Sequence, residues 1–191
     1  MILSENLRPV EDIVWDIKEQ RLNEPHLIVL MVDDDQDDYI VVKSAFEASL
    51  IKVDLRWVED GQEAMDYLLH ADKYLARDTS PRPDLILLDL ILPRKDGFET
   101  LKDIKGHAYL RRIPVVLLTS STMREHKSSG LELGADSFIV KPQSLDEMIR
   151  IMGSLHEYYF SIVSLPDKIW PSAPFPGTLR SPNPVHLACV P

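Results

Sequence analysis

Four apolar stretches of this sequence each end in polar side chains, and those side chains differ in kind. The stretches and the residues that follow them are 27–32 with Asp33, Asp34 and Asp35; 85–88 with Asp89; 115–118 with Thr119; and 137–140 with Lys141. Uninterrupted apolar runs of this length predict interior strands of a parallel sheet. Because open α/β sheets bind ligands beyond the carboxyl ends of their strands, we expect carboxylates, a hydroxyl and an amine to meet at one rim.

This set of side chains fits a site that holds a divalent cation beside a carboxylate that accepts a phosphoryl group. Oxygen ligands from one or two carboxylates, completed by water, are those that Mg²⁺ prefers. The hydroxyl of Thr119 can donate a hydrogen bond to a phosphoryl oxygen, and the ammonium of Lys141 can attract one as a point charge. Asp89 stands alone at the end of the central stretch and is the candidate acceptor.

The same residues lie in four short motifs, V-D-D, L-L-D-L-x-L-P-x-x-D-G, L-L-T-S and V-K-P, in that order. Through these motifs the sequence resembles the receiver domain of two-component response regulators over residues 26–163. The resemblance implies a doubly wound α/β fold with a five-stranded parallel sheet in the flavodoxin-like order 2-1-3-4-5. It also implies a phosphorylation switch, in which a partner histidine kinase transfers a phosphoryl group to Asp89 and the surface of the protein changes.

The resemblance assigns roles to individual residues. The expected ligands of Mg²⁺ are Asp33, Asp34, Asp89 and the backbone carbonyl of Ile91. Thr119 and Lys141 are expected to contact the phosphoryl group. Thr119 and Phe138 are expected to act as switch residues. For Phe138, an ordinary place in the core is the competing interpretation. The resemblance further implies a cis peptide bond between Lys141 and Pro142.

Residues 70–83, which precede the central strand, form a longer segment than in chemotaxis-type regulators. With the L-L-D-L-x-L-P motif, this segment makes the sequence most similar to single-domain regulators that pair with bacterial phytochrome kinases. Because the segment is polar and ends in two prolines, we expect a helix extension followed by a loop.

Apolar periodicity and capping residues predict the other elements of the domain. Expected are an edge strand over 53–58 and helices over 36–48, 61–69, 98–105, 124–133 and 145–163. Three aspartates, Asp35, Asp37 and Asp38, are expected to cap or charge-stabilise the start of the first of these helices. Gly97 is expected to permit a turn and Gly134 to cap a helix in the left-handed conformation.

The acidic cluster also fits a second class of protein. Residues 33–35 satisfy the D-x-D motif of haloacid dehalogenase-type phosphatases, in which Asp33 would be the nucleophile. Against this alternative, Gln36 and Asp37 stand where that family has a small β-branched residue, its late acidic metal motif is missing, and Asp89 would have no role. A third interpretation is a scaffold that binds partners without phosphorylation, which the presence of all five key residues argues against.

Composition restricts the partners and the compartment. The 191 residues carry a net charge of −10, and binding to nucleic acid or to an anionic membrane needs clustered cations, so we expect neither of these partners. A single cysteine, Cys189, cannot form an intrachain disulfide and favours a reducing compartment. No apolar run reaches membrane-spanning length and the N-terminus does not read as a signal sequence, so we expect a cytoplasmic protein.

Two segments flank the predicted domain. Residues 1–25 carry an apolar stripe that is typical of a short amphipathic helix, which either packs on its own domain or acts as an arm for dimerisation or kinase docking. Residues 164–191 are rich in proline and are expected to form an extended tail.

The predicted last helix, residues 145–163, is apolar on more than one face, whereas a helix that packs on one sheet needs only a single stripe. We expect the excess to form a homodimer interface anchored by Tyr158, Tyr159 and Phe160. The alternative is that the tail or the N-terminal helix covers this surface.

Overall fold

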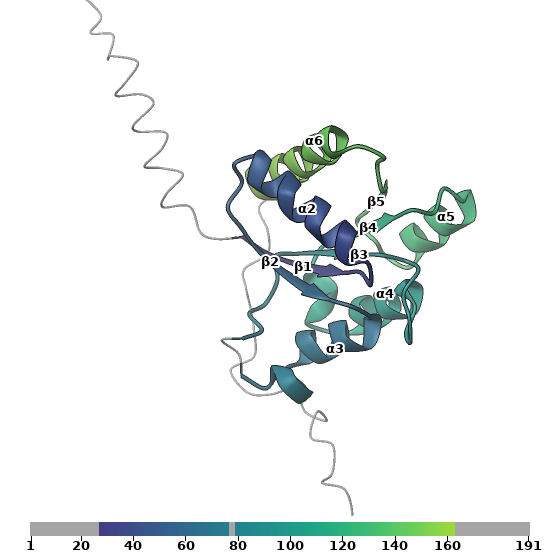
Figure 1. The fold of residues 1–191 in the computed structure, drawn as a ribbon. Coiled ribbons are helices and arrows are strands. Elements are labelled where there is room, and N and C mark those ends of the chain that lie inside the picture. Colours follow the sequence, from purple (N-terminus) through teal and green to yellow (C-terminus); the bar gives the residue numbers. More distant parts are fainter. Residues whose placement is uncertain (1–26, 77–78, 163–191) are drawn as a thin grey trace, which may run out of the picture.

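The computed structural model describes residues 27–76 and 79–162, which form a sheet with helices on both faces (Figure 1). The strands are β1 (Leu27–Val32), β2 (Val53–Val58), β3 (Leu85–Leu88), β4 (Val115–Thr119) and β5 (Ser137–Val140). The α-helices are α2 (Gln36–Ala48), α3 (Gly61–Leu69), α4 (Gly97–Gly106), α5 (Arg124–Glu132) and α6 (Leu145–His156). The short helical segments are η1 (Asp72–Tyr74), η2 (Leu110–Arg112) and the π-helical η3 (Glu157–Ile162).

The five strands run parallel in the order β2-β1-β3-β4-β5, which confirms the predicted fold. Their register brings the strand ends level, because Val32 pairs with both Val58 and Leu88, and Leu88 pairs with Leu117. Parallel strands that end level place the residues that follow them at one rim of the sheet. This is the geometric condition that the predicted site requires.

The central strands are apolar throughout because helices cover both faces of the sheet. In β3, Leu85 and Leu87 belong to the core layer under α2 and α6, whereas Ile86 and Leu88 belong to the layer over α3 and α4 (Figure 1). All four side chains are buried. Burial of one such side chain is worth about 1.5–3 kcal/mol, so the two layers fix the strands that carry the rim.

The helices that start at this rim are capped by aspartates. Asp35, Asp60 and Asp96 precede α2, α3 and α4, and each carboxylate accepts a hydrogen bond from a backbone N–H of the first turn. The predicted cap Asp35 is thus confirmed. Gly134, just after α5, has a φ of +95°, which confirms the predicted left-handed position.

The prediction of a helix extension after Leu69 is wrong. The α3 helix ends there because His70 adopts a left-handed conformation with a φ of 53°, and the separate turn η1 follows. His70 is buried, and its Nδ1 lies 2.9 Å from the hydroxyl oxygen of Ser80. A tertiary contact across residues 70–80 thus overrides the local helical preference.

The predicted cis peptide bond before Pro142 is also wrong, because no cis bond occurs in the described part of the chain. The backbone N–H of Lys141 donates to the carbonyl of Thr119 at 2.8 Å, so the sheet sets the direction of this residue. A trans bond, the lower-energy isomer even before proline, therefore suffices to bring the lysine to the rim.

The last helix differs from the prediction at its end. It is α-helical to His156 and continues as the π-helical η3. Met152, Leu155 and Tyr159 follow one another at helical spacing on the side that faces the core, and Tyr159 is only 5% exposed. Of the three predicted interface residues, Tyr158 is the exposed one, at 56%, and the side chain of Phe160 lies outside the described residues.

The predictions for residues 1–25 and 164–191 concern segments outside the described ranges. Within residues 27–76 and 79–162, no helix combines the length and apolar character needed to cross a bilayer.

Candidate functional site

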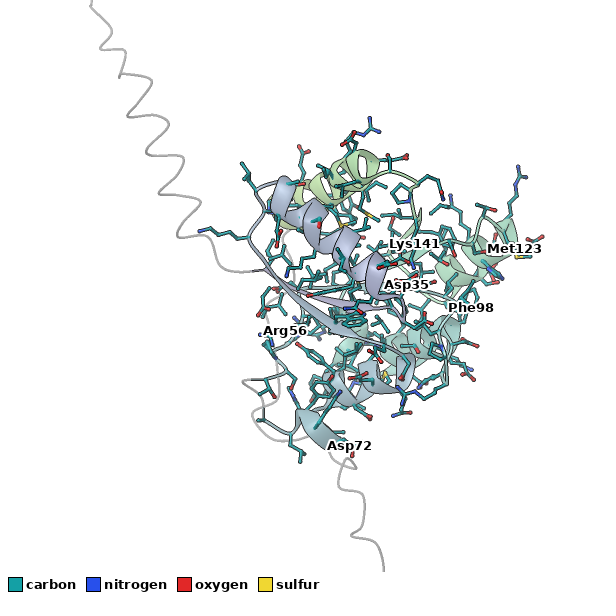
Figure 2. All side chains as sticks on the ribbon, in the orientation of Figure 1. Asp35, Arg56, Asp72, Phe98, Met123 and Lys141 are labelled. Carbon is teal, nitrogen blue, oxygen red and sulfur yellow. The ribbon has the colours of Figure 1, made fainter. Side chains whose placement is uncertain are left out.

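Lys141 lies at the centre of the rim, where three carboxylates surround its ammonium group. Its Nζ is 2.8 Å from Asp33 Oδ2, 2.6 Å from Asp38 Oδ2 and 2.6 Å from Asp89 Oδ2. These residues come from the ends of β5, β1 and β3 and from the first turn of α2. Figure 2 shows Lys141 beside the start of α2, where Asp35 is labelled. Carboxylates and an amine therefore do converge at the rim.

Asp33 and Asp89 are held in the same way. Each directs Oδ2 to Lys141 and accepts, with Oδ1, a hydrogen bond from the backbone N–H two residues later, Asp35 in one case and Ile91 in the other, both at 3.1 Å. Both side chains are buried. Sheet, turn and lysine together fix the two carboxylates in place.

Burial and charge together set the protonation of the cluster. Burial raises the pKa of Asp33 to about 6, and the hydrogen bond and charge of Lys141 offset only part of that rise. For Lys141, burial lowers the pKa, but hydrogen bonds to Asp33, Asp38 and Asp89 outweigh burial and raise the pKa above its ordinary value. Lys141 therefore stays a cation among these carboxylates.

The other predicted residues lie around this cluster. Thr119 is fully buried at the end of β4, and its hydroxyl accepts a hydrogen bond from the N–H of Ser121 at 3.3 Å. Asp34 is exposed and takes no part in the contacts with Lys141. Ile91, two residues after Asp89, exposes 60% of its surface. Phe138 is half-buried in β5 and packs against the core layer over α3 and α4.

Asp38 is a site residue that the capping interpretation missed. Its carboxylate reaches Lys141 across 103 residues of sequence, while the cap of α2 is provided by Asp35 alone. The sequence holds one signal for it: a buried lysine among carboxylates needs anionic partners, and the first turn of the helix after β1 faces the same rim. Asp37, one residue earlier, is exposed.

A second unpredicted contact lies in the loop after β4. The hydroxyl oxygen of Ser121 is 2.7 Å from His126 Nδ1, and the imidazole meets the ring of Phe98 edge to face at 5.6 Å. These contacts join the loop after β4 to α5 and α4. Neither residue carried a motif that would have identified the contact.

The donor set suits a hard divalent cation. Asp33 and Asp89 offer carboxylate oxygens only, and Mg²⁺ typically takes one or two carboxylates and completes its shell with water. Among the described residues, no group of three or more histidine, cysteine, aspartate or glutamate side chains is placed so that it could hold a metal ion. The pair Asp33 and Asp89 matches the one or two carboxylates of a partly hydrated Mg²⁺ site.

A family model described as "Response regulator receiver domain" matches residues 29–152. The chain belongs to this family. The receiver is 35% identical over 142 residues to response regulator Rcp1 of Synechocystis sp., and the match covers 74% of this chain and 95% of Rcp1. Like its homologues, this receiver is a phosphorylation switch of two-component signalling.

Solved structures of related receivers share the fold. The crystal structure of the phosphorylated cyanobacterial phytochrome response regulator RcpA matches with a TM-score of 0.68 at 35% identity, covering 74% of this receiver and 99% of RcpA. The Mn²⁺-bound form of Rcp1 matches with a TM-score of 0.65 at 35% identity, covering 73% and 99%. The phosphatase alternative is not supported, and Asp89, which it leaves without a role, lies at the centre of the site.

Proposed function

We propose that Asp89 accepts a phosphoryl group from a phosphohistidine of a partner histidine kinase. A carboxylate oxygen of Asp89 attacks phosphorus, the P–O bond forms as the P–N bond breaks, and the imidazole nitrogen of the kinase keeps the electron pair. The observation that carries this proposal is the position of Asp89, buried at the end of the central strand with one oxygen 2.6 Å from the ammonium of Lys141.

Lys141 and Thr119 are the groups that stabilise the transferred phosphoryl oxygens. Lys141 supplies a positive charge that its carboxylate partners maintain, and Thr119 supplies a hydroxyl at the end of the neighbouring strand. Preorganised donors of this kind stabilise charge that builds up during transfer, because they need no rearrangement at that moment.

We infer that Mg²⁺ is the resident cation and that Asp33, Asp34, Asp89 and the backbone carbonyl of Ile91 hold it. When bound, the cation neutralises the carboxylates and the incoming phosphoryl oxygens. Support comes from the carboxylate oxygens of Asp33 and Asp89 at the rim and from the Mn²⁺-bound form of the homologue Rcp1. In this assignment Asp34, which is exposed, binds the cation from the solvent side.

Phosphorylation is expected to change the surface of the last elements through Thr119 and Phe138. The output surface that we favour is the face of β5 and α6, where a cavity of about 580 Å³ is lined in part by Ile139, Ile151 and Tyr158. A homodimer formed there, in the cytoplasm, is the proposed signalling form. Apolar lining and an exposed aromatic side chain support this choice.

The proposed partner kinase is of the phytochrome type. Support comes from the similarity to RcpA, whose structure is that of a cyanobacterial phytochrome response regulator, and from the long segment before β3. Phosphotransfer from a purified phytochrome histidine kinase, compared with transfer from an unrelated kinase at equal concentration, tests this assignment. Equal rates from both kinases would contradict it.

Mapping of the acyl phosphate tests the central proposal. The protein is incubated with Mg²⁺ and acetyl phosphate, the acyl phosphate is reduced with borohydride, and the modified aspartate is located by mass spectrometry. We expect modification of Asp89, absent from Asp89→Asn and absent when EDTA replaces Mg²⁺. Modification of Asp33 in the wild type would overturn the assignment of the acceptor.

A further inference from the structure

The ammonium of Lys141 has as many carboxylate partners as it has hydrogens. Its Nζ donates hydrogen bonds to Asp38 and Asp89, both at 2.6 Å, and forms an ion pair with Asp33 at 2.8 Å. The side chain of Lys141 is only 10% exposed. Its position is therefore set by these three anions and not by water.

Two of the three carboxylates that contact Lys141 have a further role in the proposed function. Asp89 forms the bond to phosphorus and Asp33 binds the cation, so each must share or give up its contact with Lys141 as the site is loaded. Asp38 has no such duty, because it follows the metal-binding pair by four residues and lies on α2. It is the partner that can keep its contact throughout.

Resting on the proposed function, we propose that Asp38 is a positioning residue, which anchors Lys141 at the rim while Asp33 and Asp89 engage the cation and the phosphoryl group. The carboxylate is not needed as the side-chain cap of α2, since Asp35 provides that cap. It belongs to the first turn of a helix packed on the core, so its backbone is fixed.

A bound cation and Lys141 would share carboxylates. Asp33 and Asp89 contact Lys141 and are also assigned to the cation, whereas Asp38 is assigned to Lys141 alone. Without Asp38, a bound cation would compete with Lys141 for the two remaining carboxylates. A lysine has a long flexible stem and regains rotamer entropy when it is released, so we expect it to turn toward solvent.

The matched control is Asp37, the neighbour of Asp38 in the same helical turn. Asp38→Asn and Asp37→Asn remove the same charge from the same turn of α2, but only Asp38 contacts Lys141. Effects through the helix dipole or through attraction of the phosphodonor are therefore similar in the two variants. Asp38→Glu keeps the charge and lengthens the side chain by one methylene.

The first measurement is the reactivity of Lys141 toward an amine-acylating reagent, quantified by peptide mass spectrometry with and without saturating Mg²⁺. We expect Mg²⁺ to raise the acylation rate of Lys141 at least severalfold in Asp38→Asn, and to leave it nearly unchanged in the wild type and in Asp37→Asn. Asp38→Glu is expected to behave closer to the wild type. Equal Mg²⁺ responses in Asp38→Asn and Asp37→Asn would overturn the proposal.

The second measurement is phosphorylation by acetyl phosphate at saturating Mg²⁺, analysed as a maximal rate and a half-saturating donor concentration. We expect Asp38→Asn to lower the maximal rate roughly tenfold, the worth of one charge-assisted hydrogen bond, and Asp37→Asn to change it less than about twofold. A maximal rate in Asp38→Asn equal to that of Asp37→Asn would refute the anchoring role. Failure of the wild type to be phosphorylated would instead refute the proposed function, while the acylation measurement would still test Asp38.

Discussion

Gly97→Ala is the perturbation for which the structure gives the most direct magnitude. Gly97 is the first residue of α4, and its N–H donates to the carbonyl of Leu90 at 3.1 Å, which closes the loop after Asp89. A Cβ atom at this position would lie 2.2 Å from the carbonyl oxygen of Asp89 and 2.6 Å from the Cα of Leu90. Both are backbone atoms, so no side-chain rotation relieves the contact.

The size of the effect follows from how far the backbone must move. Close carbon–oxygen contacts in proteins lie near 3.3 Å, so the Asp89 carbonyl and α4 must separate by roughly 1 Å. Overpacking costs about 1–3 kcal/mol where neighbours can yield, and backbone yields least, so we expect Gly97→Ala to lower the free energy of unfolding by about 3 kcal/mol. Because the displaced atoms belong to the acceptor residue, phosphorylation of Asp89 should slow as well.

Gly106→Ala is the matched control, since Gly106 ends the same helix and a Cβ there meets nothing within 4 Å. We expect this variant to be as stable as the wild type or up to about 1 kcal/mol more stable, because alanine favours the helix. Urea unfolding gives the free energies, and acetyl phosphate labelling gives the rates. If Gly97→Ala matched Gly106→Ala in both assays, the close approach would not be the reason for glycine at position 97.

Three further perturbations test the site and its output. Asp33 has a pKa of about 6 in the folded protein against 3.8 for the free side chain, so its contribution to stability is present below about pH 4 and lost as the pH rises through 6. In EDTA, the free energy of unfolding of the wild type relative to Asp33→Asn should therefore fall by about 3 kcal/mol between pH 4 and 7. Parallel pH profiles of the two proteins would contradict this. Ile91→Asn places a hydrogen-bonding group beside the acceptor, so the half-life of the phosphorylated form should shorten by about fivefold, and an unchanged half-life would assign control of the attacking water to another residue. Tyr158→Glu should turn a dimer into a folded monomer in sedimentation equilibrium, because a charge would enter the proposed interface, whereas a monomeric wild type would remove the dimer from the proposal.

Much of the fold follows from local pattern. The strands over 27–32, 53–58 and 137–140 and the helices over 36–48 and 61–69 have the predicted bounds. Strand β3 also has the predicted bounds, 85–88. Strand β4 extends one residue beyond the predicted 115–118, to Thr119, and the helix predicted over 98–105 extends by one residue at each end to become α4. Pattern succeeds in the first group because alternation, capping aspartates and apolar runs are properties of neighbouring residues.

Features that depend on distant contacts were not predictable in this way. The close approach of the Asp89 backbone, and not a special φ, requires glycine at position 97, since Gly134 is the glycine with a positive φ in the described residues. Burial of His70 ends α3, and Tyr159 lies in the core of the domain. Each of these three features depends on which segments pack together in the folded protein, and the local sequence pattern does not specify that packing.

The sequence by itself determined the parallel sheet, the rim and the kinds of side chain that stand there, because a strand's apolar run and the residue that follows it are adjacent in the chain. Only the tertiary structure decided how those side chains pair. Asp38, which was expected to cap or charge-stabilise α2, forms an ion pair with Lys141, whereas Asp34 is exposed. The physical reason is that a buried ammonium forms ion pairs with the carboxylates that the packed elements bring within 3 Å of it. The register of the strands and the packing of α2 on the core determine which carboxylates these are.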